Sequence, residues 1–301
     1  MSANFVSHQT VLPWCAMQFK DIALADYQRF KEGASICELS FANLFIWHSF
    51  DRAKFTVINN NICILITPAN ETPYFLEPLG KNELGETVKT CLQHTGKMSR
   101  VTESFINTLS LKEHKIRCLR DQFDYVYETK SLAELKGKKY DGKRGHLKKF
   151  QKRHPDYTFV PLTKEHENGA MQLFEEWFSA REKTQYFSKL AYDAQKEAIQ
   201  NAFKYFNELK LLGGALIVDK VLKGFTLGSW LNPETIDVHF LYGHPGLHGV
   251  FQTILWEACN KTYHPAKLVN LEQDLGIPGL RKSKLSYHPL RLEKKFEVFL
   301  A

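Results

Sequence analysis

The alternation of hydrophobic and polar positions is clearest in the second half of the chain. Apolar residues recur every three or four positions in two stretches, which is typical of amphipathic helices. Three β-type segments follow, joined by the tight turns Asp219-Lys220 and Asn232-Pro233-Glu234. The predicted order is a strand at 157–162, helices at 165–181 and about 192–209, strands at 211–218, 221–230 and 235–242, a helix at about 250–260, and a strand opening at Leu268. This order predicts an α+β lobe in which helices flank a mostly antiparallel, mixed sheet.

The first half shows shorter elements in mixed order. We expect helices at 20–31, 41–50 and 84–95, and strands at 54–58, 62–66, 74–76, 116–119 and 125–127. The run Asn59-Asn60-Asn61 predicts a hairpin turn, because asparagine tolerates left-handed backbone conformations. The aromatic side chains of 41–50 are too many for one exposed face, so this segment is expected to be buried. Together these elements predict a second α+β lobe.

Length and composition agree with two lobes. The chain has 301 residues, of which 44% are hydrophobic and 24% charged, and this suits two globular domains. The expected division is an N-terminal tail or added strand at 1–18, a first lobe at 19–133, a basic linker helix at 134–154 and a second lobe at 155–301.

Several classes of protein are disfavoured by the sequence. No apolar run approaches the ~20 residues that span a bilayer, and the N-terminus lacks the pattern of a secretory signal. The six cysteines are widely spaced, with no CxxC pair and no histidine at metal-ligand spacing. A zinc site or a disulfide framework is therefore not expected, no metal ligand is assigned, and a reducing cytoplasm is the expected location.

Positive charge is concentrated in one segment. Nine Lys or Arg residues and one acid, Asp141, lie between Lys136 and Arg153, in a chain whose formal net charge is +7. Such a run repels itself unless an anion offsets it. It is either a solvated surface helix between the lobes or an element that faces phosphate. In the second case Lys143, Arg144 and Lys148 are candidate ligands, and 136–153 is a candidate surface for tRNA.

Two segments carry a family resemblance. NLEQDLGIPGLRKSKLSYHP (270–289) resembles the closing signature of the phosphatidylglycerol lysyltransferase C-terminal family, and ELKGKKYDGKRGHLKKF (134–150) is similar to its central basic segment. The resemblance implies two tandem GNAT-like (acetyltransferase-like) lobes in a stand-alone member without a membrane portion. It also implies transfer of an aminoacyl group from aminoacyl-tRNA.

The stretch after Leu268 supplies most candidate site residues. Asn270 lies in the predicted strand, and Glu272 and Asp274 would share one face if that strand continues. Ile277-Pro278-Gly279-Leu280 fits a type II turn. Beyond the turn, Arg281 and Lys284 are candidate phosphate ligands or partners of the acids, and Tyr287 is a candidate donor to an oxyanion. A solvated strand–turn–helix connection is the alternative interpretation.

Two further candidates precede this stretch. His239 lies two residues from Asp237 on a predicted strand, so both side chains should share one face; a hydrogen-bonded core histidine is the alternative. Gly246 and Gly249 lie in a glycine-rich turn that leads into a helix, where free N–H groups can bind phosphate. The glycine spacing departs from the usual coenzyme A loop, which argues against ordinary acetyl-CoA use.

An activated aminoacyl ester needs a positioned acceptor, a proton acceptor and oxyanion donors. The candidate catalytic residues are Glu272, Asp274, His239 and Tyr287. The leading hypothesis is an acyltransferase that moves an aminoacyl group from tRNA to an amine or hydroxyl, with an anionic lipid or a small molecule as acceptor. The alternatives are an acyl-CoA-dependent N-acyltransferase and a non-catalytic protein that binds RNA or an anionic ligand. Acceptor identity and oligomeric state stay open.

Overall fold

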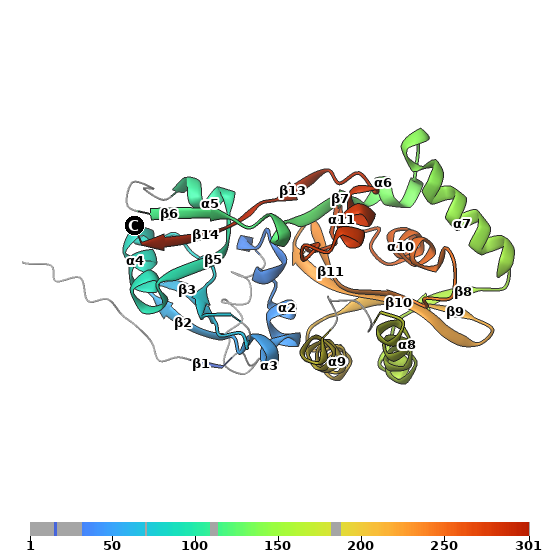
Figure 1. Cartoon of the computed structure of the whole chain (residues 1–301), viewed down its shortest axis with the longest axis horizontal. Coiled ribbons are helices and arrows are strands. Elements are labelled where there is room, and N and C mark those ends of the chain that lie inside the picture. Colours follow the sequence, from blue (N-terminus) through green and yellow to red (C-terminus); the bar gives the residue numbers. More distant parts are fainter. Residues whose placement is uncertain (1–14, 17–31, 70, 109–113, 182–187, 301) are drawn as a thin grey trace, which may run out of the picture.

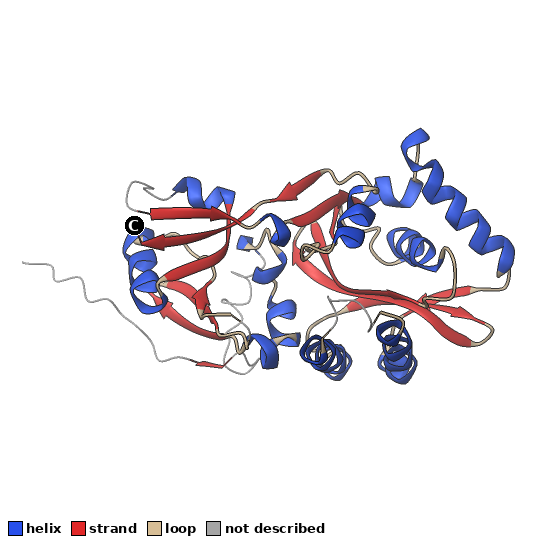
Figure 2. Ribbon diagram, viewed as in Figure 1, coloured by secondary structure: helices blue, strands red, loops and turns tan. Residues whose placement is uncertain are grey.

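The protein is described from a computed structural model, which covers residues 15–16, 32–69, 71–108, 114–181 and 188–300. Two seven-stranded sheets, each flanked by helices, lie side by side along the long axis of the molecule (Figures 1 and 2). Their strand orders are β1-β2-β3-β4-β5-β14-β6 and β13-β7-β12-β11-β10-β9-β8. In each sheet one neighbouring pair is parallel, β4 with β5 and β11 with β12, and the other pairs are antiparallel. The predicted architecture of two mostly antiparallel, mixed sheets is confirmed.

The first sheet is built from short elements. Its strands are β1 (Cys15–Ala16), β2 (Lys54–Ile58), β3 (Asn61–Ile66), β4 (Tyr74–Phe75), β5 (Lys97–Thr102), β6 (His114–Cys118) and β14 (Lys295–Leu300). Its helices are α2 (Phe41–Ile46), α3 (His48–Asp51), α4 (Leu84–Thr95) and α5 (Glu103–Thr108). Asn59 and Asn60 both adopt positive φ at the β2–β3 turn, as the sequence predicts. The predicted helix at 20–31 lies outside the described residues.

The second sheet carries longer strands. They are β7 (Asp124–Glu128), β8 (Thr158–Pro161), β9 (Leu212–Val218), β10 (Val221–Asn232), β11 (Thr235–Gly243), β12 (Leu268–Asn270) and β13 (Arg291–Glu293). The helices are α6 (Thr129–Glu134), α7 (Asp141–Arg153), α8 (Glu167–Ser179), α9 (Lys189–Lys204), α10 (Val250–Lys261) and α11 (Pro278–Leu285). Helices α8 and α9 cover one face of this sheet, and α10 and α11 lie over the other (Figure 1). The bounds of β7 to β11 and of α8, α9 and α10 agree with the predicted elements within a few residues. Helix α7 begins at Asp141, later than the basic linker helix expected at 134–154, and α6, α11 and β13 have no predicted counterpart.

The sheets exchange strands across the expected lobe boundary. Strand β7 precedes the basic segment in the chain, yet it pairs with β12 and β13 in the second sheet. The last strand, β14, returns to the first sheet and pairs with β5 and β6. The expected ranges 19–133 and 155–301 therefore do not match the sheets, because β7 of the first range pairs in the second sheet and β14 of the second range pairs in the first.

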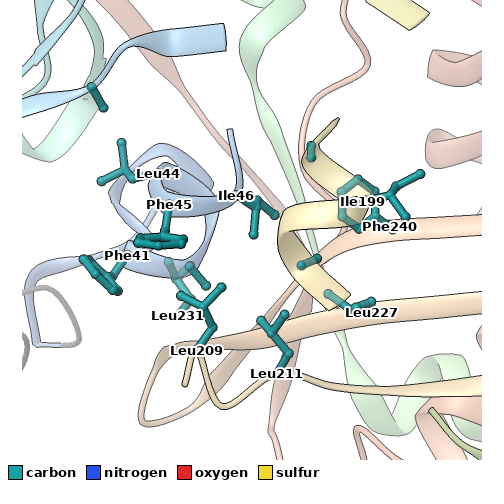
Figure 3. Close-up of a cluster of buried hydrophobic side chains, with 14 of the residues drawn as sticks. Phe41, Leu44, Phe45, Ile46, Ile199, Leu209, Leu211, Leu227, Leu231 and Phe240 are labelled. Carbon is teal, nitrogen blue, oxygen red and sulfur yellow. The ribbon is translucent and has the colours of Figure 1, made fainter. Parts of the chain in front are cut away.

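A hydrophobic core joins the two halves. Helix α2 packs on α9, so Phe41, Phe45 and Ile46 share one buried cluster with Ile199 and residues of the second sheet (Figure 3). Each of these four labelled side chains is at most 6% exposed. The predicted burial of the aromatic segment 41–50 is thus confirmed for α2, and the reason is packing between the two halves.

One local prediction is wrong. Residues 277–280 do not form a type II turn, because Pro278 occupies the first turn of α11. Proline suits that position, where its fixed φ is helical and its missing N–H has no intrahelical partner. Among the described residues, no helix combines the length and apolar character that crossing a bilayer requires.

Candidate active site

A pocket lies where two parallel strands separate. Strands β11 and β12 pair only over 235–237 and 268–270, after which the chain leaves the sheet through the loop 271–277. Residues 238–242 of β11, residues 271–273 of the loop and part of α11 line a cavity of about 220 Å³ in this opening. Four residues predicted for the site are in the lining, His239, Glu272, Lys284 and Tyr287.

His239 occupies a β-bulge on β11. Leu227 of β10 pairs with Phe240, and the next residue, Gly228, pairs with Val238, so His239 is the extra residue. Bulges re-aim side chains and are common beside active sites. Here the imidazole has partners on both nitrogens, because Nδ1 lies 3.2 Å from Glu272 Oε1 and Nε2 lies 2.9 Å from Ser229 Oγ.

Glu272 is held from three sides. Its backbone has φ +56°, and its N–H donates to Oδ1 of the buried Asn270 at 2.8 Å. Its Oε1 accepts from Asn43 Nδ2 on α2 at 3.1 Å and contacts His239. Desolvation is the main cause that raises the pKa of Glu272, against the hydrogen bond to His239, which lowers it. The result is a fixed carboxyl group at the pocket wall with a side chain 19% exposed.

Asp237 lies behind this pair. Its Oδ2 is 3.6 Å from His239 Nδ1, so the two side chains share one side of β11 as predicted. The carboxyl is fully buried, and neither oxygen has a hydrogen-bond partner among the described residues. Burial, and then the nearby Glu272, raise the pKa of Asp237 well above its usual range. Donor atoms of Asp237, His239 and Glu272 lie within 4.8 Å of one another, a set that could also hold a metal ion.

Lys284 and Tyr287 complete the wall on the α11 side. Lys284 Nζ donates to the carbonyl oxygens of Leu271, Glu272 and Gln273, and so ties the loop to α11. Desolvation lowers the pKa of Lys284 to about 8. Tyr287 is 3% exposed, and its hydroxyl has no hydrogen-bond partner among the described residues. Burial raises the pKa of Tyr287, so the phenol stays protonated and can donate.

Asp274 and Arg281 lie outside the pocket lining, in an ion-pair network. Strand β12 ends at Asn270, so Asp274 does not continue it beside Glu272. Arg281 Nε and Arg120 Nη1 donate to Asp274 Oδ2 at 2.9 and 3.1 Å, and the Tyr125 hydroxyl donates to it at 2.6 Å. Burial by itself raises the pKa of Asp274, but the hydrogen bonds from Arg281 and Tyr125 lower it to about 2. This carboxylate is therefore fully engaged in structure.

The basic segment 136–153 forms a short helical turn at Lys138–Tyr140 and then α7, and its start is joined to the pocket wall. Lys143 Nζ donates to Ser286 Oγ at 2.6 Å and lies 3.8 Å from the centre of the Tyr287 ring. The Tyr140 hydroxyl donates to the Tyr287 carbonyl at 3.1 Å. Arg144 binds Asp141 and the carbonyl oxygens of Leu135 and Gly137. Lys148 is exposed, further along the helix.

The glycine-rich turn that contains Gly246 and Gly249 lies where α7 contacts the start of α10. Gly249, with φ +88°, is the N-cap of α10, and a Cβ there would come within 2.6 Å of the His146 carbonyl oxygen. The Gly246 N–H donates to His244 Nδ1 at 3.1 Å. Neither glycine lines the cavity described above. The turn thus brings α10 and α7 into close contact, which accounts for Gly249 without a phosphate.

Comparison with known proteins places the chain in a family. Residues 31–299 match the family model described as phosphatidylglycerol lysyltransferase, C-terminal. The chain belongs to this family. The match covers the pocket and both sheets apart from β1, so the resemblance seen in 134–150 and 270–289 extends over nearly the whole chain.

Solved structures agree with this membership. A conserved protein of unknown function from Bacteroides thetaiotaomicron is 28% identical, with a TM-score of 0.84 over 93% of this chain and 98% of that one. L-PGS from Bacillus licheniformis is 13% identical, with a TM-score of 0.62 over 92% of each chain. A tandem GNAT protein from the clavulanic acid biosynthesis pathway is 8% identical, with a TM-score of 0.51 over 97% and 98%. The fold is therefore a tandem GNAT-like one.

One curated relative is an uncharacterized protein of Mycoplasmoides gallisepticum, 26% identical over 178 residues. The alignment covers 58% of this chain and 55% of that protein, so this family member spans about half the length of the curated relative it matches.

Sequence reasoning missed several residues of this family member's pocket. Trp177 of α8 and Tyr242 of β11 line it, and their rings meet edge to face at 4.9 Å. Asn43 and Ser229 hold Glu272 and His239 from α2 and β10. Alternation could have placed Ser229 on the inner face of a strand, but no local pattern links Asn43 to a residue 229 positions away.

Proposed function

We propose that this protein transfers an aminoacyl group from aminoacyl-tRNA to an amine or hydroxyl acceptor in the β11–β12 pocket. Membership of the phosphatidylglycerol lysyltransferase C-terminal family and the tandem GNAT-like fold support acyl transfer. The observation that carries the proposal is the contact between the basic helix and the pocket. Lys143 of α7 lies directly over Tyr287, which lines the cavity.

The exposed cations of α7 suit the tRNA part of the donor. Lys148, Lys149, Lys152 and Arg153 are all exposed, on one helix of 13 residues. Phosphate contacts supply most of the affinity of such surfaces and make it depend on salt. The first turn of α7 packs against α11. A tRNA bound along α7 would therefore have its aminoacylated 3′ end directed toward the cavity.

We assign a different role in the reaction to each of three pocket residues. In the reaction the nucleophile forms a bond to the ester carbonyl carbon, the bond to the ribose oxygen breaks, and the proton lost by the nucleophile ends on that oxygen. The Tyr287 hydroxyl, which is buried and has no hydrogen-bond partner among the described residues, donates to the carbonyl oxygen as it becomes an oxyanion, a role it can fill without reorganisation. Glu272 holds the α-ammonium group of the donor. His239 is a positioning residue, because both ring nitrogens are engaged in holding Glu272 and Ser229.

A transfer assay tests the proposal. Purified protein is mixed with total tRNA charged with radiolabelled amino acids and with hydroxylamine as a small amine acceptor, and the labelled hydroxamate is measured. We expect a rate above that of the Glu272→Gln variant, which keeps the shape but loses the charge. A rate equal to the uncatalysed one, for wild type and variant alike, would refute aminoacyl transfer from tRNA.

A further inference from the structure

The walls of the pocket are mostly apolar. Trp177, Phe240 and Tyr242 form one wall, which belongs to the core under α8 and α9. Phe251, Leu271 and Tyr287 form the opposite wall, on the side of α10 and α11. A group that enters between these walls leaves water on both sides. Apolar side chains gain from this burial, whereas a charged group loses its hydration.

The charges in the lining are few and balanced. Among the described residues that line the pocket, Glu272 is the one carboxylate and Lys284 the one ammonium group. Lys284 is committed to the carbonyl oxygens of the 271–273 loop. Asp237 is close but does not line the cavity. One incoming ammonium group can therefore pair with Glu272, and a second would meet Lys284 without a partner.

The volume also limits the ligand. A cavity of about 220 Å³ equals the space of about seven water molecules at ~30 Å³ each. That is room for one amino-acid side chain with its ammonium group. It is too small to enclose a long acyl chain.

From the lining, the charge balance and the volume, we infer that the pocket selects an aminoacyl group with an apolar side chain, of the leucyl, methionyl or phenylalanyl class, over a lysyl or arginyl group. The side chain lies between the aromatic walls, and its α-ammonium group pairs with Glu272. This inference rests on the proposed function for the nature of the ligand, an aminoacyl group, but it concerns only the pocket.

Binding of aminoacyl analogues tests the inference without tRNA or acceptor. L-Leucinamide, L-phenylalaninamide and L-lysinamide are titrated against the full chain by calorimetry, with N-acetyl-L-leucinamide as a probe that lacks the ammonium group. We expect the two apolar amides to bind at least tenfold more tightly than lysinamide, since an unpaired ammonium group is costly to bury. Loss of the ammonium group should weaken binding by a similar factor. Equal or tighter binding of lysinamide, or no binding of any amide, would overturn the inference.

A charge added to the wall should reverse the preference. Leu280 lines the pocket from α11 and is half-buried, so Leu280→Glu offers a second carboxylate where the chain can accommodate it. We expect this variant to bind lysinamide more tightly than wild type and leucinamide more weakly. Leu280→Gln is the matched control, because Gln has nearly the same shape and polarity as Glu but no charge. We expect it to weaken the binding of leucinamide without strengthening the binding of lysinamide. A gain for lysinamide in both variants would contradict the charge argument.

The two proposals fail separately. If the amides rank as expected while no charged tRNA supports transfer, the proposed function falls and the pocket preference stands. If lysyl transfer from tRNA outpaces leucyl and phenylalanyl transfer, the function stands and the preference falls.

Discussion

Lys295 and Asp124 form a fully buried ion pair between the two sheets, with 2.6 Å from Lys295 Nζ to Asp124 Oδ1. Asp124 opens β7 in the second sheet, and Lys295 opens β14 in the first. Lys295 also contacts Glu38, and Asp124 accepts from the Cys37 N–H at 2.8 Å and from Asn270 Nδ2 at 3.0 Å. The same asparagine accepts from the Glu272 N–H. The strand exchange and the pocket loop therefore share one polar network.

Loss of the ammonium group from this network should be costly. Lys295→Met leaves Asp124 buried without its counter-charge, and removal of one partner of a buried pair costs about 3–5 kcal/mol. Urea denaturation should show this loss in the free energy of unfolding. Lys294→Met is the matched control, because Lys294 is an exposed neighbour that pairs with Glu103 at the surface. Its cost should stay within about 1 kcal/mol, and equal costs for the two variants would contradict the role of burial.

Asp274 predicts a dependence of stability on pH. Its pKa in the folded state is about 2, below the usual value of an unfolded aspartate, so its charge stabilises the fold above the unfolded pKa. This contribution is lost as pH falls through the folded pKa. We expect Asp274→Asn to be less stable than wild type by a constant amount from about pH 5 upward, and the difference to shrink toward pH 2.

Thermal unfolding of both proteins across this pH range measures the effect. Asp121→Asn is the control, because Asp121 pairs with the same Arg281 but its side chain is 61% exposed. If the difference in stability between wild type and Asp274→Asn did not change with pH, the negative charge of Asp274 would not be what stabilises the fold.

Much of the second sheet could be predicted from the sequence because its strands are buried in regular patterns. In β9, β10 and β11 nearly every position is apolar or small, and the turns between them carry Asp, Asn or Pro. Strand β5 was missed because its sequence, KMSRVT, mixes polar residues with few apolar ones, and its pairing with β14 supplies the burial. That pairing joins residues about 200 positions apart, which local patterns do not report.

The sequence predicts the identity of several pocket residues better than it predicts how they are arranged. The sequence predicts Glu272 and Asp274 on one face of a continued strand, but the strand ends at Asn270 and Glu272 adopts a positive φ. The bulge that places the buried His239 at the cavity depends on the register between β10 and β11, which alternation alone does not show. Trp177 lies at helical spacing from the buried Ala170, Leu173 and Phe174 of α8, a pattern that predicts core, yet its side chain also borders the cavity.

Tyr287→Phe should separate stability from catalysis. Its hydroxyl is buried and unpartnered among the described residues, so removal should leave the free energy of unfolding unchanged or slightly higher. The rate of aminoacyl transfer should fall by about 10²–10³, the usual effect of losing one oxyanion donor. The hydroxamate assay and urea denaturation measure the two effects.

Tyr263→Phe is the reverse control for this prediction. Tyr263 is buried, and its hydroxyl shares a hydrogen bond of 2.7 Å with Thr226, away from the residues that line the pocket. We expect a loss of about 1 kcal/mol in stability and an unchanged rate. A Tyr287→Phe variant that keeps the full rate would remove this phenol from the mechanism.

The last prediction concerns the exposed charges of α7. Reversal of Lys148, Lys149 and Lys152 to Glu should weaken tRNA binding at least a hundredfold and flatten its dependence on salt, since each lost phosphate contact lowers the slope by about 0.7–0.9. Lys143 and Arg144 are left intact, because their contacts hold α7 to α11 and to the preceding turn.

The control reverses three exposed lysines of the first half, Lys54, Lys81 and Lys89, for the same change in net charge. Filter binding at several salt concentrations measures both variants. Equal weakening in the two would show a general charge effect, whereas weakening confined to the α7 variant would identify this helix as the tRNA surface. Since the pocket stays unchanged, the α7 variant should still bind leucinamide like wild type.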